Sequence, residues 1–159
     1  MVLKYLNDDE ILKVAVNLEQ DGVEFYKKCV SLSKVEKAKS MFLFLAGEEE
    51  KHFAYFKKLD QHIEYMKFRP GEIDEEISMY LRSLIDTGVF SNKFTDHDWE
   101  NFTDKMAVEF GINIEKYSIL FYSGVLKITE NEDSVRALTK IIEEEKRHLV
   151  ALTIHWKEL

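Results

Sequence analysis

Two copies of a Glu-x-x-His motif are the most distinctive chemical feature of this sequence. Glu49 precedes His52 by three residues, and Glu145 precedes His148 by the same spacing. Residues three or four positions apart lie on one face of an α-helix, so each pair can present a carboxylate and an imidazole in the same direction. Carboxylate and imidazole groups together suit iron or manganese. One such motif would be weak evidence for a metal site, whereas two at matched positions are strong evidence.

An internal repeat connects these motifs to a second pair of glutamates. At a constant offset of 96 residues, several residues of the first half recur in the second: Asn17 as Asn113, Glu19 as Glu115, Phe25-Tyr26 as Phe121-Tyr122, Glu48-Glu49 as Glu144-Glu145, and His52 as His148. Any two amphipathic helical hairpins would share apolar stripes. Shared stripes do not account for matched glutamates and histidines within those stripes.

The matched polar residues interrupt the apolar faces of predicted helices. Glu19 lies in line with Ala15 and Val23, and Glu115 lies in line with Gly111. Six residues of ligand type therefore fall on inward faces: Glu19, Glu49, His52, Glu115, Glu145 and His148. Burying an unpaired carboxylate costs several kcal/mol. Two divalent cations would balance the four carboxylates, so this set predicts a di-metal site.

The four glutamates are also predicted to lie at one level of the protein. Glu19 and Glu49 are equidistant from residue 34, and Glu115 and Glu145 are equidistant from residue 130. Each glutamate is therefore about 15 residues, or ~22 Å, from the turn between its two helices. If both hairpins are antiparallel, the four carboxylates meet near mid-bundle.

Helical periodicity predicts four long helices that contain these residues, and no segment shows the sustained alternation of a β-strand. Three of the helices are expected over about 8–32, 34–66 and 133–157. The remaining helix, third in order, is expected to begin between residues 99 and 105 and to end at about 128. Short links join the first helix to the second and the third to the fourth, which makes each pair an antiparallel hairpin. The fold class is therefore all-α, a ferritin-like four-helix bundle of two hairpins joined by a long crossover.

We expect one domain over residues 1–159. Its parts are hairpin A over about 8–66, a crossover over about 67–102 and hairpin B over about 103–158. Within the crossover, the pattern predicts a short helix over 73–85 and a loop over 86–98.

Composition narrows the possible functions. The 159 residues are 45% hydrophobic, enough for one core, and the net charge of −8 disfavours binding to nucleic acid. The single cysteine, Cys29, excludes an internal disulfide framework and any CxxC zinc motif in this chain. No apolar run approaches the ~18–20 residues of a membrane span. We expect a cytoplasmic protein with no membrane or nucleic-acid partner.

Four segments resemble the rubrerythrin-type branch of the ferritin-like superfamily: AVNLEQDGVEFYKKC, FLAGEEEKHFAYF, INIEKYSILFY and IIEEEKRHLVAL. The resemblance covers both hairpins. It implies a bridged di-iron site, with manganese as a possible substitute, whose ligands are Glu19, Glu49, His52, Glu115, Glu145 and His148. Rubrerythrins carry a further glutamate at the position of Ser118, and usually a rubredoxin-like domain, which we do not expect here.

Some assignments stay open at the level of sequence. Glu48 and Glu144 each lie four residues before a motif histidine, so spacing alone permits them as ligands; the family pattern favours Glu49 and Glu145. Tyr26 and Tyr122 either hydrogen-bond to ligand carboxylates or are core aromatics. We do not expect the remaining histidines to be ligands: His62, His97 and His155.

Two glycines close to the predicted ligands also permit two interpretations. Gly22 and Gly111 interrupt helices, where glycine costs about 1 kcal/mol relative to alanine. They either leave space beside the metals or allow close helix packing.

The leading functional hypothesis is a redox enzyme that reacts with O₂ or hydrogen peroxide at two iron ions and receives electrons from a separate donor protein. The alternative is a protein that oxidises, binds or stores iron without sustained turnover. A third hypothesis is a structural bundle with a vestigial metal site. We expect a homodimer or a higher homo-oligomer.

Overall fold

A computed structural model of the chain describes residues 6–61, 75–88 and 94–159. These ranges form helices and contain no strand: α1 (Asp8–Leu32), α2 (Glu36–Gln61), α3 (Glu75–Thr87), α4 (Asp96–Glu100), α5 (Asp104–Ile128) and α6 (Glu132–Glu158). The predicted all-α class is confirmed. No helix in these ranges is both long enough and apolar enough to cross a membrane.

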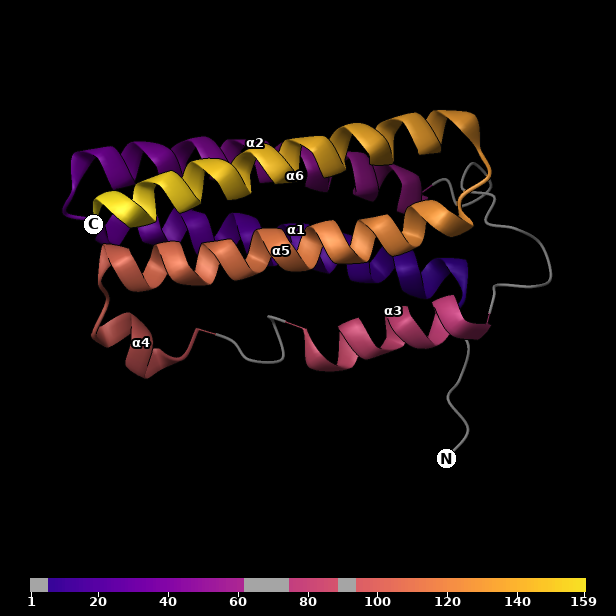
Figure 1. Cartoon of the computed structure of the whole chain (residues 1–159), viewed down its shortest axis with the longest axis horizontal. Helices are drawn as coiled ribbons and strands as arrows, with labels where there is room; N and C mark the ends of the chain where they lie inside the picture. The colour runs from indigo at the N-terminus through magenta and orange to yellow at the C-terminus, as the bar shows by residue number, and fades with distance from the viewer. Residues whose placement is uncertain (1–5, 62–74, 89–93) are drawn as a thin grey trace.

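Four long helices lie side by side as a bundle (Figure 1). α1 and α2 form one antiparallel hairpin, and α5 and α6 form the other. α1 packs against α5 and α2 against α6, which joins the hairpins, while the short α3 packs along α5. The predicted bundle of two hairpins is therefore confirmed.

Local capping explains where several helices begin. Asn7 and Glu10 form a reciprocal capping box, so α1 begins at Asp8 as predicted. Thr103 and Asn131 accept hydrogen bonds from backbone N–H groups in the first turns of α5 and α6. The predicted end of the second helix at residue 66 lies outside the described residues, because α2 is described only to Gln61.

The predicted loop over residues 86–98 is wrong at both ends. α3 continues to Thr87, and α4 begins at Asp96. α4 forms because Thr95 and Asp98 make a second capping box, which satisfies backbone N–H groups at the start of even a short helix. The predicted helix over 73–85 matches α3 in its described part.

Two apolar clusters fill the bundle, one on each side of a polar layer. One cluster includes Leu12 and Phe121, and the other includes Phe42 and Leu152. In each long helix, the inward-facing polar residues separate the residues of one cluster from those of the other. The bundle therefore buries a polar layer between two apolar clusters.

Candidate metal centre

Each of the four long helices contributes to the polar layer. α1 and α5 each supply one buried glutamate, Glu19 and Glu115, and α2 and α6 each supply a Glu-x-x-His pair. All six side chains predicted as ligands are buried, with relative exposures between 0% and 3%: Glu19, Glu49, His52, Glu115, Glu145 and His148. The structure brings all six into two overlapping groups that could each hold a metal ion.

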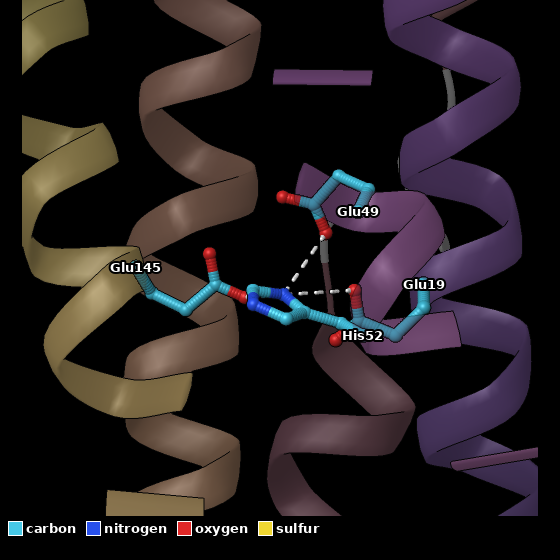
Figure 2. A group of neighbouring side chains, drawn as sticks. All are labelled: Glu19, Glu49, His52 and Glu145. Atoms are coloured by element: carbon cyan, nitrogen blue, oxygen red, sulfur yellow. Dashed lines mark ion pairs between the residues drawn. The ribbon is translucent and has the colours of Figure 1, made fainter. Parts of the chain in front are cut away.

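The first group surrounds His52 (Figure 2). Its Nδ1 atom lies 3.2 Å from Oε1 of Glu145, 3.7 Å from Oε2 of Glu19 and 3.9 Å from Oε2 of Glu49. These residues come from three helices and point toward one another. An imidazole nitrogen and three carboxylate oxygens thus converge on one point.

The second group surrounds His148 in the same way. Its Nδ1 atom lies 3.0 Å from Oε2 of Glu145, 3.7 Å from Oε2 of Glu115 and 3.8 Å from Oε1 of Glu49. Glu49 and Glu145 belong to both groups, and each turns one oxygen toward His52 and the other toward His148. If each group held an ion, Glu49 and Glu145 could serve both ions.

Unsatisfied polar atoms point to cations as the missing partners. Within the described part of the chain, five buried atoms of the cluster have no hydrogen-bond partner: Oε2 of Glu19, Oε1 of Glu49, Nδ1 of His52, Oε2 of Glu115 and Oε1 of Glu145. Such orphaned groups are rare in native proteins, because each costs about 1–3 kcal/mol. Carboxylate-rich donors with one imidazole for each position fit iron or manganese. The donor set therefore fits a metal site.

Crowding of the carboxylates shifts their pKa values apart. Burial, followed by the charge of Glu145, raises the pKa of Glu115 to about 8. Burial and the neighbouring carboxylates also raise the pKa of Glu49 well above its usual value. Burial acts in the same direction on Glu145, but its hydrogen bond with His148 and the nearby imidazole of His52 outweigh burial and hold its pKa at about 2. Without cations, the cluster must therefore retain protons.

The imidazoles of His52 and His148 also bind protons in the metal-free cluster. Burial lowers the pKa of His148, but the neighbouring carboxylates of Glu115 and Glu145 outweigh burial and raise the pKa to about 9. The pKa of His52 is raised as well, since Glu145, Glu19 and Glu49 surround it and outweigh the effect of burial. Divalent ions would take the place of these protons.

Two buried tyrosines hold the glutamates that are not shared. The Tyr26 hydroxyl donates to Oε1 of Glu115 at 2.6 Å, and the Tyr122 hydroxyl donates to Oε1 of Glu19. Each tyrosine thus reaches the glutamate of the opposite hairpin. In both glutamates the other oxygen, Oε2, is left unbonded toward the cluster. The hydrogen bonds favour the first of the two roles considered for these tyrosines.

Glu48 and Glu144 contact the opposite hairpin's histidines, a relationship that sequence spacing did not reveal. Nε2 of His52 lies 3.0 Å from Oε2 of Glu144, and Nε2 of His148 lies 3.9 Å from Oε2 of Glu48. Neither glutamate belongs to the two potential metal-binding groups found among the described residues. Their matched positions in the repeat were the only signal in the sequence.

The two glycines in the polar layer differ in how closely other side chains approach them. A Cβ at Gly111 would lie 3.2 Å from the Tyr26 hydroxyl, and one at Gly22 would lie 3.5 Å from Oε2 of Glu49. Gly111 in particular leaves room for the tyrosine that binds Glu115. The structure therefore favours close packing at Gly111, whereas a Cβ at Gly22 would make only ordinary van der Waals contact with Glu49.

Three histidines were not expected to be ligands, and the structure describes two of them. Both lie outside the two potential metal-binding groups. His97 is exposed on α4 beside Asn101. His155 is buried on α6, seven residues beyond His148, and is in neither group. His62 lies outside the described residues.

Comparisons with known proteins agree with this geometry. A protein-family model described as rubrerythrin matches residues 10–153. Among solved structures, the chain is similar to a candidate ferritin-like diiron-carboxylate protein from Thermotoga maritima, with 26% sequence identity and a TM-score of 0.70. That alignment covers 99% of each chain. No curated protein sequence gives a significant match.

Proposed function

The chain belongs to the rubrerythrin family, and on that basis we propose that it is a ferritin-like di-iron protein with a redox function toward hydrogen peroxide or O₂. The proposal includes an occupancy of two ions per chain and electrons supplied by a separate donor protein. Manganese is an alternative metal, because the same donor set suits it.

The observation that carries the proposal is the sharing of Glu49 and Glu145 between both histidines. Each ion would have one histidine, one unshared glutamate and both shared glutamates, which divides the six residues evenly. Four carboxylates with two divalent ions also give a neutral buried centre. A neutral centre avoids the high cost of burying net charge.

Two iron ions at this position would supply the electrons that reduce peroxide or O₂. The chain's own contribution is to hold and shield them. Tyr26 and Tyr122 fix one oxygen of each unshared glutamate, so the other oxygen stays directed at the centre. The apolar clusters on both sides of the polar layer exclude water along the bundle axis.

The test begins with metal content. Metal-free protein is loaded anaerobically with ferrous iron, and iron per chain is measured by elemental analysis. We expect about two ions, and oxidation by peroxide that is visible in the absorption spectrum. Continued peroxide or O₂ consumption with an added electron donor supports the enzyme proposal.

Other results would identify a different function. A single round of oxidation that no electron donor can renew favours the iron-binding or storage alternative. Retention of only trace iron after reconstitution overturns the metal centre itself. The variant Glu115→Ala serves as the negative control, because it removes one predicted ligand without touching the motif histidines.

A further inference from the structure

Glu48 and Glu144, the outer carboxylates, face the distal nitrogens of the two cluster histidines. Each histidine turns Nδ1 toward the cluster and Nε2 toward an outer carboxylate of the opposite hairpin. The side chains of Glu48 and Glu144 are 16% and 19% exposed, so they lie at the edge of the polar layer. An ionised carboxylate only accepts hydrogen bonds, so in such a contact Nε2 carries the proton.

The two contacts are unequal despite their matched positions in the repeat. Glu144 is within hydrogen-bond distance of His52, at 3.0 Å. Glu48 stays 3.9 Å from His148 and pairs instead with Lys51 on its own helix. The two halves of the cluster therefore differ in how firmly their histidines are held.

A difference in sequence next to the histidines accompanies this inequality. Phe44 and Lys140 occupy the same position in the repeat. The Phe44 ring packs edge-on against His148, with 5.9 Å between ring centres. Lys140 instead lies 3.8 Å from Glu144, its Nζ approaching Oε1, while Oε2 of Glu144 faces His52. One histidine is thus supported by an aromatic ring and the other by a hydrogen-bonded carboxylate.

We propose, on the basis of the di-metal centre proposed above, that Glu144 is a positioning residue that holds His52, and that the metal position at His52 binds more tightly than the one at His148. A hydrogen bond to Nε2 places the proton there and leaves the Nδ1 lone pair for the ion. It also fixes the plane of the ring. Glu48 provides no comparable bond, so the His148 position lacks this support.

The test compares four variants with wild type, using Co²⁺ alone as the probe and a competing chelator to resolve two stepwise affinities. Removing the hydrogen-bond partner of a metal ligand typically weakens metal binding by roughly 10- to 100-fold. We expect a loss of this size for Glu144→Ala in the tighter of the two stepwise affinities. Glu144→Gln retains an acceptor oxygen and should recover part of that loss. Glu48→Ala should change either step by less than about threefold, since a partly exposed ion pair contributes little.

Glu143→Ala is the matched surface control. Glu143 neighbours Glu144 in sequence but pairs with Lys146 at the surface, so its removal should leave both affinities unchanged. Circular dichroism of each metal-free variant checks that the bundle is folded.

A second measurement separates positioning from a general structural effect. In protein loaded with Zn²⁺, the Nε2–H proton of His52 should give a slowly exchanging NMR signal in wild type. That signal should exchange faster in Glu144→Ala and be retained in Glu48→Ala. Equal Co²⁺ affinities for Glu144→Ala and wild type, or equal losses for Glu144→Ala and Glu48→Ala, would overturn the inference. Failure of wild type to bind two ions would instead count against the di-metal centre.

Discussion

Tyr26 and Glu115 belong to different helical hairpins and are joined by a buried hydrogen bond of 2.6 Å. Tyr122 and Glu19 form the reciprocal bond. Both bonds cross the interface between α1 and α5 at the level of the polar layer. The two halves of the chain are therefore tied together by the same glutamates that we propose as metal ligands.

Removing one of these hydroxyls tests the bond directly. Tyr26→Phe leaves the ring in place but deprives Glu115 of its donor, so a buried carboxylate oxygen loses its partner. We expect the free energy of unfolding to fall by about 1–3 kcal/mol in urea titrations of the metal-free protein. Tyr80→Phe is the control, since Tyr80 is exposed and its hydroxyl donates only a long hydrogen bond of 3.5 Å to the Leu120 carbonyl. Equal stability of the two variants would show that the Tyr26 bond contributes nothing.

The unshared glutamates should matter for metal content, whereas a neighbouring surface glutamate should not. In Glu19→Ala and Glu115→Ala, one ion loses a carboxylate, and elemental analysis should give no more than one tightly held ion per chain. Glu50→Ala should retain the wild-type content, because Glu50 is exposed and pairs with Lys27 at 2.5 Å. Comparable loss in all three variants would mean that the assignment of inward faces is wrong.

Metal binding should release protons and weaken as the pH falls. Glu115, with a pKa of about 8, and His148, with a pKa of about 9, hold protons near neutrality in the metal-free cluster, and ions must displace them. Affinity should therefore decrease from about pH 9 to about pH 6. Calorimetric titrations in two buffers of different ionisation enthalpy measure the protons released. Binding that released no protons at neutral pH would contradict this expectation.

Two glycines in helix interiors should respond in opposite ways to alanine. A Cβ at Gly47 would meet no atom within 4 Å, so Gly47→Ala should stabilise the protein by about 1 kcal/mol through helix propensity. A Cβ at Gly111 would press on the Tyr26 hydroxyl at 3.2 Å and on Leu152 at 3.4 Å, and Tyr26 is held by Glu115. Gly111→Ala should therefore be less stable than wild type in urea unfolding. If both variants are stabilised, Tyr26 can move more freely than its contacts indicate.

Removal of metal should lower the thermal stability of the protein. Four buried carboxylates and two imidazoles then share a few protons, and ligand-type atoms are left without partners. Ions that bind only the folded chain add about 2.7 kcal/mol at a hundredfold excess over the dissociation constant. The thermal transition temperature of wild type should therefore rise when ions are returned. The transition temperature of the double variant Glu19→Ala/Glu115→Ala should not rise. Identical transitions with and without metal would support the vestigial-site hypothesis.

The sequence alone determined which residues face inward and at what height. The 3.6-residue period places Glu19 and Glu115 on apolar stripes, and the rise of a helix is constant. Distances counted from the short turns at residues 34 and 130 therefore predicted a common level, and the structure has the four glutamates in two overlapping groups. The face and height of a residue are local geometric properties of a helix, so one sequence is enough to predict them without related sequences.

Only the tertiary structure decided which atoms meet. Spacing along a helix fixes the face and height of a residue, but not its rotamer or its partner on a neighbouring helix. The crossed bonds of Tyr26 and Tyr122, and the contact of Glu144 with His52, depend on how the two hairpins dock. The short helix α4 was missed for a related reason: its capping box is a local signal, but with only five residues it leaves no periodicity to detect.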